Sequence, residues 1–175
     1  MGPWRYAINM ALSEAEKKEV TGLANAGVTG KWMLFPDVEW VRGVWADVVA
    51  ATEEGRLGYA AKVATDHKPG KGVLICVYTK DWRDQRDVAR VLAELRAMGT
   101  GQRLSYKEDA ATLALHYGKG ASLYVSQAES MDFDQRRSGY TPGDQHALFG
   151  DPEEQEERTP EEVFSRDEPY GPFPD

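Results

Sequence analysis

The sequence predicts an α+β fold in which a mainly antiparallel sheet is covered on one face by helices. Short apolar segments rich in β-branched residues, such as 73–79, have the length of buried strands. Two longer stretches repeat apolar residues at helical spacing. Short connections that contain Gly or Pro separate these segments, which favours hairpins over the long crossovers of a parallel sheet.

The first predicted helix begins at a capping signal near the amino terminus. Ser13 is followed three residues later by Glu16, the pattern of a capping box, and the helix extends to about Ala24. The cluster 25–27, which contains Asn and Gly, ends it. A strand over 30–35 follows.

A second helix is predicted to start at Pro36 and Asp37 and to stop near Gly55. Its apolar residues fall on one face: Val38, Val41, Trp45, Val48 and Val49. The segments 57–65 and 73–79 then read as two strands, and the Lys-, Pro- and Gly-rich loop between them predicts a hairpin with a long turn.

A third helix is predicted over 81–98, because its apolar residues recur at helical spacing: Val88, Val91, Leu92 and Leu95. Beyond a Gly-rich turn at 99–101, three short segments have strand character: 103–107, 111–117 and 122–126. The middle one has a second interpretation, a helix over 110–116.

Charge and proline divide the chain into two parts. Residues 1–126 carry 17 Lys and Arg against 15 Asp and Glu, a balance of +2, whereas 127–175 carry 4 against 14, a balance of −10. Six of the nine prolines lie in the second part. The sequence therefore predicts one globular domain over 1–126 and an acidic, Pro-rich tail over 127–175, either flexible or docked as an extension. The tail either shields a basic site or is merely solvated.

Several classes of protein are disfavoured by composition. Cys76 is the single cysteine and lies in an apolar run, so a buried, inert thiol is expected rather than a disulfide. With a single cysteine, no metal or redox framework is expected, and no cofactor is expected. The Gly-Lys-Gly sequences at 70–72 and 118–120 are weak signals for phosphate, since neither follows the P-loop pattern. Bilayer-length apolar segments and signal-peptide features are missing, so a cytoplasmic location is expected. The balance of +2 gives little support for nucleic-acid binding.

Three basic residues, Lys80, Arg83 and Arg86, gather where the strand 73–79 feeds the third helix. A helix start exposes unpaired N–H groups and the positive end of its dipole, so this junction suits a phosphate or carboxylate. Simple helix capping by Asp81, with Asp84 nearby, explains the same residues. Both interpretations stay open.

Four motifs in order carry a resemblance to a known family: GKWMLF, EGRLGYAAKVAT, LICVYTKDWRDQRDVARV and LSYKEDAATLALHYGKG. Over residues 30–126 this succession resembles the uncharacterised proteins typified by the basophilic leukaemia-expressed protein. The resemblance implies a curved sheet similar to that of the cap-binding translation initiation factor 4E. Prokaryotic members are described as candidate phosphothreonine lyases, so it also implies a phosphorylated peptide or protein as substrate.

A lyase of this kind works by β-elimination, which needs a base, an acid and cations that hold the phosphate. Lys62 interrupts the apolar strand YAAKVA and is the candidate base, or else it points to solvent from an edge strand. Lys107 is a second catalytic candidate, and His67 is the candidate acid, although both also suit an ordinary surface position. Candidate substrate-binding residues are Lys80, Arg83, Arg86 and Tyr106.

Two non-catalytic hypotheses compete with elimination. One is a module that recognises an anionic ligand such as a nucleotide, a cap-like group or a phosphoprotein; the other is a small interaction protein that works through its acidic tail. Cap binding itself is disfavoured, because Trp32 and Trp45 suit the core while Trp40 and Trp82 lie at helix starts. His116 likewise suits the core better than catalysis.

Overall fold

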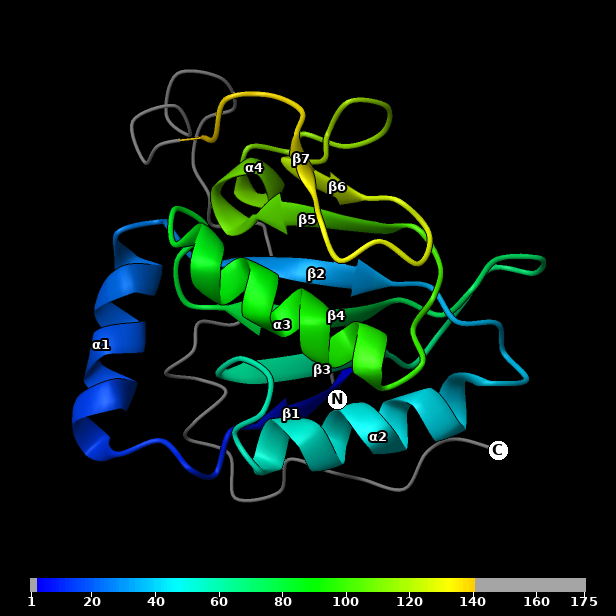
Figure 1. Ribbon diagram of the computed structural model, residues 1–175, viewed down its shortest axis with the longest axis horizontal. Helices are drawn as coiled ribbons and strands as arrows, with labels where there is room; N and C mark the ends of the chain where they lie inside the picture. The colour runs from blue at the N-terminus through cyan, green and yellow to red at the C-terminus, as the bar shows by residue number, and fades with distance from the viewer. Residues whose placement is uncertain (1–2, 141–175) are drawn as a thin grey trace.

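The computed structural model describes residues 3–140 and forms one antiparallel sheet with helices packed against it (Figure 1). The seven strands lie in the order β1-β3-β4-β2-β5-β6-β7. Every neighbouring pair is antiparallel, which confirms the predicted α+β class. The strands are β1 Trp4–Ile8, β2 Gly30–Leu34, β3 Ala60–Ala64, β4 Ile75–Thr79, β5 Leu104–Glu108, β6 Tyr124–Ser126 and β7 Asp134–Gln135.

Two long helices, α2 (Val41–Glu53) and α3 (Gln85–Ala97), lie together across one face of the sheet in Figure 1. Arg90 of α3 donates to the carbonyl of Leu57, just beyond α2, so the two helices are also joined by hydrogen bonds. Helix α1 (Glu14–Asn25) instead buries Val20 in an apolar cluster on the opposite face. The short helix α4 (Asp109–Leu113) follows directly from β5.

The alternation of side chains along each strand gives the sheet two different faces. The face under α2 and α3, called here the helix face, carries the main core, which includes Trp32, Val77 and Tyr106. The opposite face, called here the lysine face, carries the alternate residues of the same strands, including Lys31 and Lys107. The predicted core positions of Trp32 and Trp45 are confirmed.

The first helix begins as its sequence predicts. The Ser13 hydroxyl accepts from the Glu16 N–H at 3.2 Å, and the Glu16 carboxylate accepts from the Ser13 N–H at 2.7 Å. This is a capping box, and it satisfies two backbone donors that the first turn would otherwise leave unpaired.

The other two long helices begin later than predicted. Helix α3 starts at Gln85 because Asp84, rather than Asp81, caps it: the Asp84 side chain accepts from the Asp87 N–H at 3.2 Å. Helix α2 starts at Val41 because the residues after Pro36 first form a turn. In this turn the Asp37 carbonyl accepts from the backbone N–H groups of Trp40 and Val41.

The β3–β4 hairpin is confirmed, although both strands are shorter than predicted. Gly58 precedes β3 at a point where a Cβ atom would overlap the Tyr78 carbonyl oxygen, so only glycine fits there. Segment 110–116 follows its helical interpretation, as α4. Strand β1 was not predicted; it is held at the sheet edge by pairing with β3, with Tyr6 opposite Lys62.

The first part of the predicted tail, 127–140, is docked on the domain. Strand β7 pairs with β6, and the Phe133 ring lies 5.9 Å from that of Trp32 and 4.8 Å from that of Tyr124. The Arg137 guanidinium binds both carboxylate oxygens of the fully buried Glu108. Residues 141–175, with most of the acidic side chains of the predicted tail, lie outside the described part of the chain.

Between residues 3 and 140, none of the helices combines the length and the apolar character needed to span a bilayer.

The aromatic contacts of Phe133 predict that this segment stabilises the fold. We expect Phe133→Ala to lower the free energy of unfolding by about 2–4 kcal/mol, because it removes a large ring packed on the core. Met131→Ala is the control, since Met131 is 55% exposed two residues away and should change stability by less than about 0.5 kcal/mol. Urea denaturation measures both, and equal small effects would contradict docking of the segment.

The buried Arg137–Glu108 ion pair predicts that removing one partner destabilises the fold more than removing both. Arg137→Met should cost about 3–5 kcal/mol, because it leaves the Glu108 carboxylate buried without its cation. Adding Glu108→Leu should recover much of that loss, since the buried charge is then absent. Thermal and urea unfolding test this pair, and a double variant as unstable as the sum of the singles would refute the interpretation.

Candidate functional site

A pocket of about 340 Å³ opens on the lysine face of the sheet. Three lysines from three different strands line it: Lys31 of β2, Lys62 of β3 and Lys107 of β5. All three are buried, with exposed fractions of 3%, 2% and 4% respectively. Lysine is among the residues least often fully buried in proteins, so three in one pocket are a distinctive feature.

The register of the sheet brings the three lysines together. Lys31 and Lys107 lie directly opposite each other in the β2–β5 pair. Lys62 lies opposite Cys76, whose other neighbour across the sheet is Met33, two residues from Lys31. Because residues two apart share a face, all of these side chains point into the same pocket. Cys76 is buried, as predicted.

Helix α4 supplies the polar partners of Lys31. The Lys31 Nζ donates to Asp109 Oδ1 at 2.6 Å and to Thr112 Oγ1 at 2.8 Å. The second oxygen of Asp109 accepts from the Thr29 hydroxyl at 2.6 Å, so the carboxylate is held from two sides. Lys31 is therefore fixed as a charged ammonium group at one end of the pocket.

Aromatic rings surround the other two ammonium groups. The Nζ of Lys62 lies 4.1 Å from the ring centroid of Trp4 and 5.7 Å from that of Tyr78. The Nζ of Lys107 lies 3.9 Å from the ring centroid of Tyr117. The negative face of an aromatic ring attracts a cation, so these rings help to hold the two ammonium groups in place.

The remaining lining of the pocket is apolar or uncharged. Among the described residues that line it, none is acidic, and Ser105, Thr112 and Ser122 supply hydroxyl groups. A concave site with a few convergent polar groups on an apolar wall has the general form of a small-molecule pocket. Its three positive charges suit an anion.

Lys62 and Lys107 are the two predicted site residues that the structure brings together in this pocket. His67 lies exposed in the loop between β3 and β4 and does not line it. Lys80 instead meets Glu19, with an Nζ to Oε1 distance of 3.3 Å. Arg86 is exposed on α3, on the other face of the sheet.

Arg83 is engaged by a neighbouring carboxylate at the start of α3. Its guanidinium donates to both oxygens of Asp81, each at 2.9 Å. These hydrogen bonds raise the pKa of Arg83 above its usual value. The charges of Arg83 and Asp81 offset each other locally. Because Asp84 caps the helix, the junction agrees with the interpretation as simple helix capping.

Tyr106 lies on the opposite face from Lys107, because adjacent strand residues point in opposite directions. It is fully buried beside Gly30, and its hydroxyl is 2.6 Å from that of Thr79. Burial raises the pKa of Tyr106 well above its usual value. The structure therefore assigns it to the core rather than to the pocket.

Lys31 was missed by sequence reasoning, although its signal resembles that of Lys62. Each is a lone lysine within an apolar strand, in GKWMLF and in YAAKVA. Trp4 was missed because its strand was not predicted. Asp109 has no distinguishing signal in the sequence, because its contact with Lys31 depends on the turn that places α4 beside β2.

His116 lies near the rim of the pocket, next to Tyr117, but does not line it. Its Nδ1 is 2.6 Å from the Tyr140 hydroxyl. Burial and then the positive charges of Arg137 and Lys107 lower the pKa of His116 below its usual value. A neutral, hydrogen-bonded histidine agrees with a structural role.

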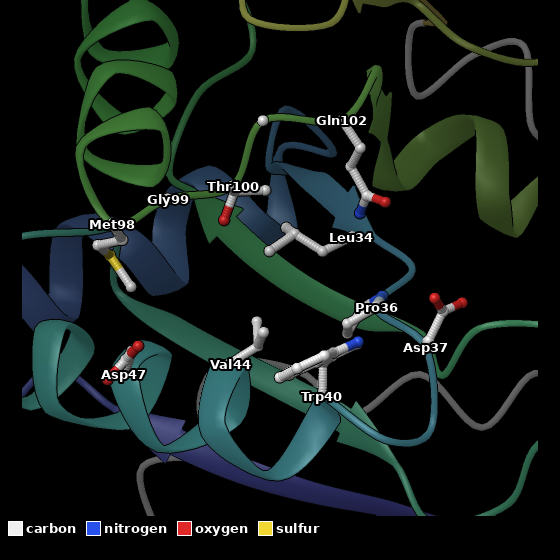
Figure 2. A pocket seen from close by; sticks show the side chains of 11 residues that line it. Leu34, Pro36, Asp37, Trp40, Val44, Asp47, Met98, Gly99, Thr100 and Gln102 are labelled. Carbon is white, nitrogen blue, oxygen red and sulfur yellow. The ribbon is translucent and has the colours of Figure 1, made fainter.

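A second pocket, of about 240 Å³, lies between the start of α2 and the end of α3 (Figure 2). Figure 2 shows two carboxylates at its edges, Asp37 and Asp47, with Trp40 and Met98 on its walls. None of its described lining residues is basic, so it does not suit an anion. Trp40 faces this pocket on the helix side of the molecule and is remote from the lysine face.

No group of three or more His, Cys, Asp or Glu side chains within residues 3–140 is placed to hold a metal ion. The pocket on the lysine face, with its three buried lysines, is the candidate site. The three strands that carry these lysines, β2, β3 and β5, lie in the part of the chain that a family model matches. That model is described as Basophilic leukemia-expressed protein Bles03, and it matches residues 5–114. The chain belongs to the Bles03 family.

Proposed function

We propose that this protein binds a small anionic ligand, through its phosphate group, in the pocket of Lys31, Lys62 and Lys107. The convergence of three buried lysines in one pocket carries this proposal. Each of the three comes from a different strand and is buried, and all three line the same concave pocket. Ammonium groups at a concave site donate charge-assisted hydrogen bonds to phosphate oxygens.

Phosphate fits the donors that the pocket offers. Each ammonium group has three N–H donors and no acceptor, and a phosphate monoester presents three oxygens that accept charge-assisted hydrogen bonds. The three lysines come from three strands and all line the pocket. Asp109 neutralises part of the charge at Lys31, so the pocket favours a dianion over a large polyanion.

β-Elimination from a phosphothreonine or phosphoserine is a second candidate function. In this reaction a base takes the Cα proton, the electron pair forms a Cα=Cβ bond, and phosphate leaves with a proton from an acid. Its support is that Lys62 and Lys107, the two candidate bases, line the same pocket. However, the reaction also needs an acid, and His67, the candidate for that role, is exposed in the loop between β3 and β4 and does not line the pocket. Binding is therefore the function that the geometry supports best.

The lysine pocket predicts which residues control phosphate affinity. Lys62→Met and Lys107→Met should each weaken binding of inorganic phosphate by about 1.5–3 kcal/mol, because each removes a charge-assisted hydrogen bond and keeps the apolar stem. Lys80→Met is the matched control and should leave affinity unchanged. Isothermal titration calorimetry measures all three. A loss confined to Lys80→Met or Arg83→Met would place the anion at the start of α3 instead.

Elimination is distinguished from binding by product mass. We expect a phosphothreonine peptide to be recovered intact after incubation with the protein, because no described histidine or acidic side chain lines the pocket to protonate the leaving phosphate. Mass spectrometry of the peptide is the measurement. A product lighter than the unphosphorylated peptide by one water would show elimination, and loss of that product in Lys62→Met but not Lys107→Met would identify the base.

A further inference from the structure

The lysine pocket changes in polarity along the direction of its strands. At one end, Lys31 and Lys107 lie opposite each other across β2 and β5. One step along, Met33 lies between Cys76 and Ser105, with Lys62 beyond Cys76. The site therefore begins with a row of two charged groups and continues with a row of mixed character.

The far end of the pocket is apolar. Leu74 pairs through its carbonyl with Ala64, the residue opposite Trp4 in the β1–β3 pair. Phe35 follows β2 where Leu74 precedes β4, and both line the pocket. Leu74, Phe35 and Trp4 thus form a third, apolar row across the sheet. Phe35 lines the pocket and is 50% exposed, so part of its side chain is open to solvent.

We propose that the ligand is an amphipathic phosphate monoester, with its phosphate at the lysines and an aromatic or branched apolar body against Met33, Leu74 and Phe35. This inference rests on the proposed anion-binding function and adds the chemical class of the rest of the molecule. An apolar body that covers these side chains removes apolar surface from water on both partners.

The size of the pocket agrees with this class. A volume of about 340 Å³ is at the small end of the range for small-molecule sites and is much larger than a free phosphate needs. The phosphate occupies only the part of the pocket that the three lysines line. The remaining space is bounded mainly by carbon and sulfur atoms, against which a polar body such as glycerol would lose hydrogen bonds to water without replacing them.

The experiment compares three phosphates of similar charge in calorimetric titrations of the full-length protein: inorganic phosphate, glycerol phosphate and phenyl phosphate. Burial of a phenyl ring predicts that phenyl phosphate binds about tenfold or more tightly than glycerol phosphate. Phe35→Ala should reduce that ratio about threefold or more. Val38→Ala is the matched control, because Val38 is 47% exposed in the same connection but does not line the pocket.

The outcomes separate this inference from the function on which it rests. Equal affinity for the two esters would overturn the apolar-body proposal while leaving phosphate binding intact. A preference for phenyl phosphate that Phe35→Ala does not reduce would overturn the placement of the body at this end. Failure of all three phosphates to bind would refute both this inference and the proposed function.

Discussion

The two-residue period of the antiparallel strands is the constraint on which the rest of this structure depends. It places neighbouring residues on opposite faces of the sheet. Lys31 and Lys107 therefore lie on the lysine face, whereas Trp32 and Tyr106 lie on the helix face. The helix face is filled by aromatic and aliphatic side chains under α2 and α3. The lysine face is thereby supported by a rigid core, and its polar groups hold fixed positions.

The support of this core matters because burying three lysines in the pocket lowers the stability of the fold. Each buried ammonium group loses hydration, and the three repel one another. The structure offsets part of this cost locally, through Asp109 at Lys31 and through aromatic rings at Lys62 and Lys107. These contacts hold the three lysine side chains in place at the pocket.

Three successive residues at the end of β5 link the pocket to the rest of the domain. Lys107 points into the pocket, Glu108 points to the other face and binds Arg137, and Asp109 starts α4 and binds Lys31. The docked segment 127–140, the helix face and the lysine pocket are therefore connected at one point of the chain. A disturbance of the Glu108 ion pair acts directly beside two groups of the pocket.

The sequence by itself determined the local features of this protein, because they depend on residues close together in the chain. The Ser13 capping box, the helical spacing of Val88 to Leu95 and the hairpin of β3 and β4 follow from such short-range rules. The candidate site was found in part, since a lysine inside an apolar strand such as YAAKVA is a visible anomaly.

Only the tertiary structure decided which of these unusual residues lie close together. Strand order is set by long-range pairing and core packing, which no local pattern specifies, and it places Lys31 opposite Lys107 while leaving Arg83 paired with Asp81 outside the pocket. The same pairing added β1, and with it Trp4, to the edge of the sheet. It also sent Tyr106 into the core, because strand register fixes the face of each residue and amino-acid type does not.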